Sequence, residues 1–330
     1  MDQQLDKIVI DDFQISNPFP GLRSFEEDEN ILFFGREKQV DDLIRKLRKN
    51  RFLGVIGTSG SGKSSLVKSG LLPSLYGGFM AGAGSHWRTV TFRPGTNPIG
   101  NMAKALNHSG QGILHKIGVD SVEYSDLIET TLRRSNQGLI EYYKQNTTNN
   151  REHLLVLIDQ FEEIFRFSEF EKSAKDGFRD STAFINLLLK TAEQTELPIY
   201  IVFTMRSDFL GDCTSFKGLP EAINDGHYLV PRMTRDQTRE AIEGPIAVGK
   251  GEITPGLVNR LLNDVGDNPD QLPILQHSLM RIWDYWEKKT DKIGPIDIDH
   301  YESIGTMKEA LSLHAEEAFV ELHHTYNNHY

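Results

Sequence analysis

The chain has 330 residues, of which 38% are hydrophobic and 25% charged, and its formal net charge is −11 at pH 7. This composition is typical of a globular protein of two or three domains, and the acidic balance argues against a dedicated nucleic-acid-binding protein, which needs clustered Lys and Arg. The single cysteine, Cys213, excludes an intrachain disulfide, and no apolar run approaches the ~20 residues of a membrane span. Because the N-terminus has no signal-peptide pattern, we predict a cytoplasmic protein.

The predicted elements alternate between strands and helices through the first two thirds of the chain. The chain begins with an unpatterned arm, residues 1–16. The first helix is expected further on, where the apolar residues Val40, Leu43, Ile44 and Leu47 recur at helical spacing. Near-continuous apolar runs then follow between helices, and such runs are typical of parallel strands covered on both faces. We expect strands at 52–56, 88–92, 154–158 and 199–204, a short one near 228–230, helices at 62–75 and 181–196, and one or two helices within 93–150.

After Pro231 the strand pattern nearly stops. Helical patterns are expected at 234–243, 254–265, 270–288 and 299–327. The sequence therefore predicts an α/β domain with a mainly parallel sheet covered by helices at 17–230, a small helical domain at 231–297, and the start of a third unit at 298–330.

The most informative motif is a phosphate-binding loop, or P-loop, that fills every position of the pattern G-x-x-x-x-G-K-[ST]. Its residues are Gly57-Thr58-Ser59-Gly60-Ser61-Gly62-Lys63-Ser64. The glycines let successive backbone N–H groups point at one anion, and the following helix N-terminus adds its positive dipole end. Lys63 is expected to reach the β- and γ-phosphates, and the Ser64 hydroxyl to join the Mg²⁺ shell. We therefore predict that these eight residues and Ser65 bind ATP or ADP with Mg²⁺.

A second part of the predicted phosphate site follows the strand 154–158. Asp159 ends that strand, where a buried carboxylate needs a cation or a hydrogen-bond partner to offset desolvation. After a P-loop this cation is Mg²⁺, although an aspartate in this place can also only cap a helix.

Hydrolysis also needs a group that orients or deprotonates the attacking water. In many P-loop ATPases that group is a glutamate directly after the magnesium aspartate, but here the residue is Gln160. Either Glu162 or Glu163 takes the role from one turn further on, or hydrolysis is slow. Both glutamates could instead only favour a helix N-terminus through its dipole.

Three other positions are candidates for nucleotide contacts. Arg206 follows the strand 199–204 and could read the γ-phosphate, unless it only pairs with Asp208 to shape the loop. Gly35 and Arg36 form a turn ahead of the P-loop strand that could bring backbone groups to the base and sugar. Pro273 lies in the first turn of the helix 270–288, where proline is favoured in any case.

With these blocks in place, the chain resembles the STAND class of signalling NTPases, in particular the bacterial subgroup called novel STAND NTPase 1, over roughly residues 17–325. The resemblance rests on Asn17-Pro18-Phe19-Pro20-Gly21-Leu22, Phe34-Gly35-Arg36-Glu37, the P-loop, Asp159-Gln160-Phe161-Glu162-Glu163, Arg206-Ser207-Asp208-Phe209, Glu243-Gly244-Pro245, Gln271-Leu272-Pro273-Ile274-Leu275-Gln276 and His314-Ala315-Glu316-Glu317. It implies an AAA+/NACHT-like P-loop NTPase fold followed by a helical domain and a winged helix, of which 298–330 holds only the start.

The resemblance also implies roles for individual residues. Gly35 and Arg36 would contact the adenine and ribose side, and Glu162 and Glu163 would be the acids of a NACHT-type arrangement. Arg206 would be the sensor arginine. Pro273 would touch the nucleotide and couple its state to domain orientation.

The resemblance further implies an ATP-driven switch that is closed with ADP and that opens and self-associates with ATP, in signalling or defence. The sensor and effector modules of such a switch are not evident in this chain. The alternative is an AAA+-like ATPase that acts on DNA or protein, of the origin-binding or remodelling type. The acidic charge and the displaced catalytic acid favour the switch, and a scaffold that binds nucleotide without hydrolysing it stays open as a third possibility.

Overall fold

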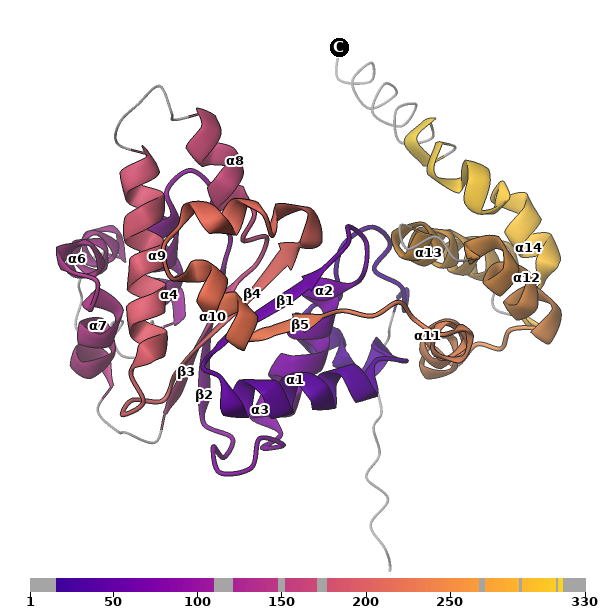
Figure 1. Ribbon diagram of the computed structural model, residues 1–330. Coiled ribbons are helices and arrows are strands. Elements are labelled where there is room, and N and C mark those ends of the chain that lie inside the picture. Colours follow the sequence, from indigo (N-terminus) through magenta and orange to yellow (C-terminus); the bar gives the residue numbers. More distant parts are fainter. Residues whose placement is uncertain are drawn as a thin grey trace, which may run out of the picture. The chain divides into compact units, whose positions relative to one another are not determined.

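The computed structural model describes residues 16–109, 121–147, 152–170, 177–266, 271–290, 293–312 and 314–316. These residues divide into two compact units, which are described separately (Figure 1). The α/β unit is Ser24–Thr234, and the helical unit contains the described residues of Met1–Arg23 and Arg235–Tyr330. The division therefore falls close to the predicted limit at 230. Residues 17–23, in contrast, group with the helical unit, whereas the sequence predicts them in the NTPase domain.

Five parallel strands form the sheet of the α/β unit, in the order β2-β3-β4-β1-β5. Their bounds are β1 Phe52–Gly57, β2 Trp87–Phe92, β3 His153–Ile158, β4 Ile199–Arg206 and β5 His227–Leu229. Each coincides with a predicted strand to within two residues, so the expected parallel sheet is confirmed.

Helices cover both faces of this sheet, because the strands place alternate apolar side chains on opposite sides. Along β3, Val156 and Ile158 belong to one hydrophobic core, and Leu155 and Leu157 belong to another. In Figure 1, α1 and α3 lie on one side of the sheet and α4, α6, α7 and α9 on the other. Burial on both faces explains why the strands read as continuous apolar runs.

Most of the helices of the α/β unit lie where the sequence predicts helices, with two differences. Three helices, rather than one or two, are described within 93–150. The expected helix 62–75 is helical throughout from Lys63, but six of its residues form a π-helix. The α-helical and π-helical bounds are α1 Glu37–Lys49, α2 Lys63–Ser65, the π-helix η2 Leu66–Leu71, α3 Leu72–Tyr76, α4 Pro98–Ser109, α6 Ser121–Arg134, α7 Gly138–Asn146, α8 Glu163–Phe170, α9 Gly177–Glu193 and α10 Leu219–Asp225. Short 3-10 helices are η1 Glu27–Leu32, η4 Ser207–Phe209 and η5 Asp212–Ser215.

The helical unit packs around a core that includes Trp283 and Trp286. Its helices are α11 Arg235–Val248, α12 Pro255–Val265, α13 Gln271–Thr290 and α14 Ile298–Ser303. The expected helix 299–327 is interrupted after α14, where Gly305 and Thr306 have φ of 83° and 58°, in the left-handed region that a right-handed helix does not continue through. The part of that helix beyond residue 316 lies outside the described residues. None of the helices described is long and apolar enough to cross a membrane.

Residues 16–23 are attached to the helical unit by side chains that lie far away in the sequence. The amide of Asn17 donates to the Met280 carbonyl at 3.0 Å and to Asp284 Oδ1 at 2.8 Å, and the Trp283 indole donates to the Ser16 carbonyl at 3.0 Å. The ring of Phe19, 3% exposed, belongs to the core of the unit. The motif Asn17-Pro18-Phe19 is therefore part of the helical unit in space.

Phe19→Ala should destabilise the helical unit by about 3 kcal/mol, because it removes a buried aromatic side chain and leaves a cavity. Chemical denaturation followed by tryptophan fluorescence reports on this unit through Trp283 and Trp286. Leu22→Ala is the matched control, since Leu22 is 57% exposed in the same segment and its loss should cost less than about 0.5 kcal/mol. Equal effects of the two changes would contradict the packing of Phe19.

Candidate functional site

The predicted site residues lie at one edge of the sheet, because all five strands are parallel and their carboxyl ends meet there. The P-loop follows β1, Asp159 follows β3, and Arg206 ends β4, which lies between them. Gly57, the first residue of the P-loop, is the direct strand partner of Arg206. The topology thus brings together three sequence blocks that are spread between residues 57 and 206.

The P-loop has the backbone shape that its glycines allow. Gly60 and Gly62 have φ of 68° and 83°, values that side-chain-bearing residues rarely adopt, and Gly62 is the residue just before α2. Lys63 folds back over the loop, where its Nζ donates to the carbonyls of Gly57 at 3.1 Å and Thr58 at 2.6 Å. The ammonium of Lys63 is thus held by two backbone carbonyls of the P-loop itself.

Arg36 supports the P-loop from the protein interior. It is buried, and its guanidinium donates to the carbonyls of Ser61 at 3.2 Å and Pro231 at 2.8 Å. Burial lowers the pKa of Arg36 to about 10, so the side chain stays charged at neutral pH. The preceding Gly35 has φ of 80°. The contact of Gly35 and Arg36 with the adenine and ribose side stays a prediction, while the observed role of Arg36 is to fix the loop backbone.

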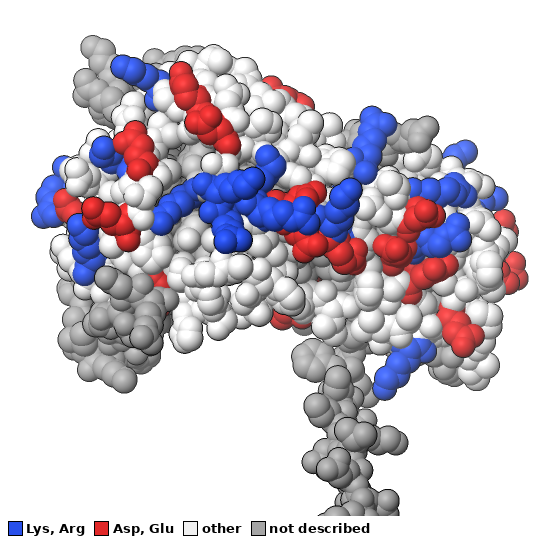
Figure 2. All heavy atoms as spheres, turned by 60° about the horizontal axis from the view of Figure 1, so that its bottom comes forward, with Lys and Arg blue, Asp and Glu red and all other residues white. Residues whose placement is uncertain are grey.

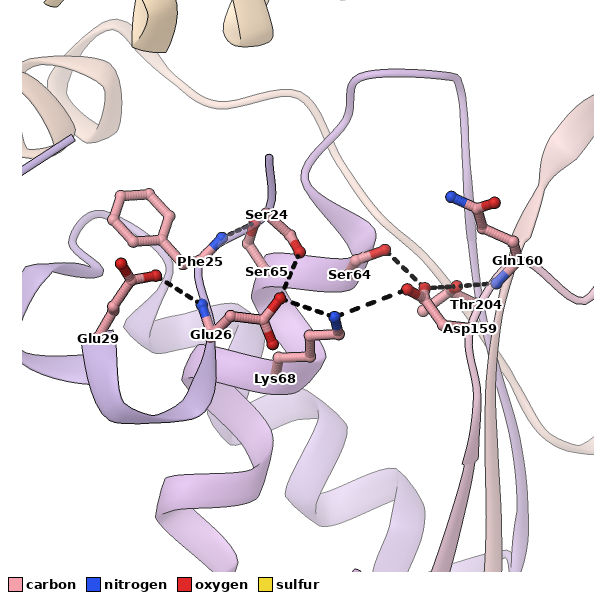
Figure 3. A network of polar contacts seen from close by, with 10 residues as sticks. All are labelled: Ser24, Phe25, Glu26, Glu29, Ser64, Ser65, Lys68, Asp159, Gln160 and Thr204. Carbon is pink, nitrogen blue, oxygen red and sulfur yellow. Dashed lines mark hydrogen bonds and ion pairs between the residues drawn. The ribbon is translucent and has the colours of Figure 1, made fainter. Parts of the chain in front are cut away.

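Asp159 is the most connected side chain of the site. The residue is 3% exposed, and Oδ1 accepts hydrogen bonds from Ser64 Oγ and Thr204 Oγ1, both at 2.7 Å (Figure 3). Thr204 Oγ1 also accepts from the Gln160 N–H at 3.0 Å. The chain turns sharply here, since Gln160 has φ of 60°. The hydroxyl of Thr204 thus fixes both the carboxylate and the turn that follows it.

The paired oxygens of Ser64 and Asp159 fit a magnesium ion. Hydroxyl and carboxylate oxygens are the hard ligands that Mg²⁺ prefers, and protein sites for it usually supply only one or two of them, with phosphates and water completing the shell. The described residues contain no group of three or more His, Cys, Asp and Glu side chains that could hold a metal by themselves.

Glu162 and Glu163 have different surroundings, although they are neighbours in the sequence. Glu162 is buried, and its Oε2 accepts from the backbone N–H of Arg206 at 3.3 Å. Burial lowers the pKa of Lys63, and the carboxylate of Glu162 is the largest of the charges that oppose this shift. The carboxylate of Glu162 therefore acts electrostatically on the P-loop lysine.

The side chain of Glu163 forms hydrogen bonds with neighbouring loops instead. Its Oε2 accepts from the Gly95 N–H at 2.9 Å, and its Oε1 lies 3.2 Å from the amide nitrogen of Gln160 once that amide is turned to satisfy both groups. Glu163 thus ties the loop after β2 to the turn after β3.

Arg206 forms the ion pair with Asp208 that the sequence offers as an alternative to a phosphate contact. The hydrogen bond from Arg206 lowers the pKa of the Asp208 carboxyl. The guanidinium also lies over the Phe209 ring, 5.9 Å from its centroid, while Nε is buried without a hydrogen-bond partner. Arg206 therefore keeps one donor unused at the sheet edge, next to the P-loop.

The remaining predicted residues lie around these groups. Thr58 and Ser59 are exposed at the tip of the P-loop, and Ser65 Oγ accepts from the Phe25 N–H at 3.2 Å. Pro273 is the third residue of α13, in the helical unit, so its contact with a nucleotide stays a prediction.

A family model described as Novel STAND NTPase 1 matches residues 18–329, nearly the whole chain. The chain belongs to this family. The likeness predicted from the sequence blocks is therefore confirmed, and with it the assignment to the P-loop NTPases. No curated protein matches the chain.

Solved structures similar to this Novel STAND NTPase 1 member share its fold at low sequence identity. The ORC2 protein of Aeropyrum pernix, in ADPNP and ADP complexes, has a TM-score of 0.53 and 10% identity over 84% of this chain and 68% of its own. The ORC1 protein of Aeropyrum pernix, in complex with DNA, has a TM-score of 0.53 and 13% identity over 82% of this chain and 64% of its own. A Walker-type ATPase of Pyrococcus abyssi has a TM-score of 0.51 and 14% identity over 92% of this chain and 78% of its own. This chain thus spans about two thirds of the length of the two ORC proteins.

Sequence reasoning missed Thr204, which this Novel STAND NTPase 1 member uses to hold Asp159. The available signal was a hydroxyl within an otherwise apolar strand, two residues before Arg206. A buried threonine in such a place needs a partner, because an unpaired hydroxyl is costly to bury.

Thr204→Val keeps the shape of the side chain and removes only the hydroxyl. It should destabilise the α/β unit by about 1–3 kcal/mol, because a buried carboxylate and the Gln160 N–H each lose a partner. The free energy of unfolding from urea titration measures this. Thr191→Val is the matched control: Thr191 is also buried, but its hydroxyl only donates to the Leu187 carbonyl of its own helix, so the change should cost less.

Proposed function

We propose that this chain is an ATP-binding and slowly hydrolysing switch, whose nucleotide state controls the orientation of its two units and its self-association in signalling or defence. The observation that carries the proposal is the P-loop whose Ser64 hydroxyl donates a hydrogen bond to Asp159. Both residues lie at the edge of the sheet where the carboxyl ends of the parallel strands meet. Membership of the Novel STAND NTPase 1 family and the separate helical unit support the switching role.

In this proposal each residue of the site has its own role in binding the nucleotide and the metal. The P-loop N–H groups and Lys63 bind the phosphates, and Ser64 and Asp159 hold Mg²⁺, which when bound neutralises charge on phosphate oxygens. Arg206, the strand partner of Gly57, is the residue that senses the γ-phosphate, and Pro273 links the helical unit to the nucleotide. Differential contacts with ATP and ADP then shift the population of closed and open forms.

Within this proposal Glu162 is the group that positions the attacking water. It is buried and its charge acts on Lys63, while both carboxylate oxygens of Glu163 are engaged by Gly95 and Gln160. The carboxylate of Glu162 also accepts from the N–H of Arg206, so the candidate base and the candidate sensor are connected through the backbone.

Lys63→Ala should weaken ATP binding by about 3 kcal/mol, or roughly a hundredfold, because it removes charged hydrogen bonds to phosphate. The fold should persist, since the ammonium contacts only loop carbonyls. A fluorescent-ATP titration with circular dichroism measures both, and Lys38→Ala, an exposed lysine on α1, is the control. Unchanged ATP affinity in Lys63→Ala would remove the nucleotide-binding proposal.

Glu162→Gln should lower ATP turnover by about a hundredfold or more, since a positioned acid–base group contributes about 10²–10⁴ in rate. Glu163→Gln should change turnover much less, because a glutamine oxygen can still accept the Gly95 N–H. Phosphate release under single-turnover conditions compares the two variants at equal ATP occupancy. Equal losses would contradict the assignment, and undetectable turnover in the unmodified chain would favour a scaffold that binds without hydrolysing.

The switch itself is tested by mass photometry and small-angle scattering with ADP, ATP and a slowly hydrolysed analogue. We expect a compact monomer with ADP and a larger or less compact species with the analogue. Lys63→Ala should show no difference between the nucleotides. Identical mass and scattering for all three nucleotides in the unmodified chain would leave an ATPase without a switch.

The alternative, an AAA+-like ATPase acting on DNA, predicts a continuous basic surface. α1 carries the exposed residues Lys38, Arg45, Arg48 and Lys49. On the face shown in Figure 2, however, Asp and Glu side chains lie directly beside the gathered Lys and Arg side chains. With 47 acidic and 36 basic residues in the chain, such a surface is poorly suited to binding the phosphate backbone of DNA. Salt-dependent affinity for duplex DNA would support the alternative.

A further inference from the structure

A lysine outside the P-loop motif lies beside the carboxylate that is proposed to hold the metal. Lys68 belongs to the π-helix η2, and its side chain is 15% exposed. Its Nζ lies 3.9 Å from Asp159 Oδ2 and 2.9 Å from Glu26 Oε1 (Figure 3). Ser64 and Lys68 are four residues apart, so one side of this helical segment brings both to Asp159.

The two oxygens of Asp159 therefore have different partners. Oδ1 accepts from the hydroxyls of Ser64 and Thr204, and Oδ2 faces the ammonium of Lys68. A buried carboxylate attracts any cation nearby, and two cations at one carboxylate repel each other. Lys68 thus stabilises Asp159 when no metal is bound and opposes a metal ion that binds there.

Glu26 supplies the counter-charge for this lysine, and its position is fixed from several sides. Its N–H donates to Glu29 Oε2 at 2.8 Å in a capping box at the start of η1, and the preceding Phe25 N–H donates to Ser65 Oγ at 3.2 Å. Ser24 Oγ donates to Glu26 Oε1 at 3.4 Å. The segment 24–26 is therefore attached to the same helical segment that carries Ser64 and Lys68.

We propose that Lys68 and Glu26 together set the metal affinity of the phosphate site. Lys68 is a positioning residue that holds Asp159 and competes with Mg²⁺. Glu26 acts through Lys68: it draws the ammonium away from Asp159 and so makes the carboxylate easier for the metal to bind. This inference rests on the proposed nucleotide site and adds two residues that no motif in the sequence identifies.

The experiment measures how strongly Mg²⁺ and nucleotide binding are coupled. The affinity for a fluorescent ADP analogue is measured in saturating Mg²⁺ and in EDTA, and the ratio of the two affinities is the coupling. Lys68→Met should raise this ratio roughly tenfold, because the positive charge that lies 3.9 Å from Asp159 Oδ2 is removed. Glu26→Gln should lower the ratio several-fold, because Lys68 then pairs with Asp159 alone.

The double variant shows whether Glu26 acts through Lys68 or whether the two residues affect metal binding independently. If Glu26 acts through Lys68, the ratio in Lys68→Met with Glu26→Gln should equal that in Lys68→Met alone, and additive changes would contradict the proposal. Glu27→Gln removes an equal charge from the adjacent residue and should leave the ratio unchanged. Similar effects of Glu26→Gln and Glu27→Gln would indicate only general electrostatics and would overturn the specific pair.

Failure of the inference is distinguishable from failure of the proposed function. An unmodified chain that binds no ADP contradicts the proposed function. A chain that binds ADP with a magnesium-dependent affinity, but whose ratio is the same in Lys68→Met and Glu26→Gln, contradicts only the role of this pair. Should Lys68→Met not fold, Glu26→Gln decides alone, since the Glu26 side chain is 50% exposed and its change leaves the core intact.

Discussion

The buried carboxylate of Asp159 is the constraint on which the site depends. An unpartnered charge in this position would cost several kcal/mol, so the protein must bring donors to it. They come from the helical segment after the P-loop, through Ser64 and Lys68, and from β4, through Thr204. The Asp159 N–H in turn donates to the Phe92 carbonyl at the end of β2. One residue thus fixes three strand ends and the phosphate loop relative to one another.

Much of the fold could be predicted because burial on both faces leaves a direct trace in the sequence. The runs that became β3 and β4 are apolar at nearly every position, and the P-loop is a contiguous motif with its own backbone requirements. Asp159 was identifiable for the same reason, as a charge that ends such a run. These features depend on local sequence, which is where periodicity and motif arguments apply.

The partners within the site could not be predicted, because they depend on contacts between distant segments. The difference between Glu162 and Glu163 is decided by where Arg206 and Gly95 lie, 44 and 68 residues away in the sequence. Lys68 and Glu26 are separated by 42 residues, and neither stands in a recognisable motif. The attachment of Asn17 to Asp284 spans 267 residues, which explains why residues 17–23 read as the start of the NTPase domain and yet pack with the helical unit.

The chain passes between the two units twice, after Arg23 and after Thr234. Next to each crossing, a backbone group is held by the phosphate-binding segment: the Phe25 N–H at Ser65, and the Pro231 carbonyl at Arg36. An extended chain spans at most about 3.6 Å per residue, so the tethers from Phe25 to Arg23 and from Pro231 to Arg235 reach only about 7 Å and about 14 Å. While these anchors hold, each connection between the two units contains only a few residues whose backbone dihedral angles are free to change. The anchors therefore leave little chain length free in either connection.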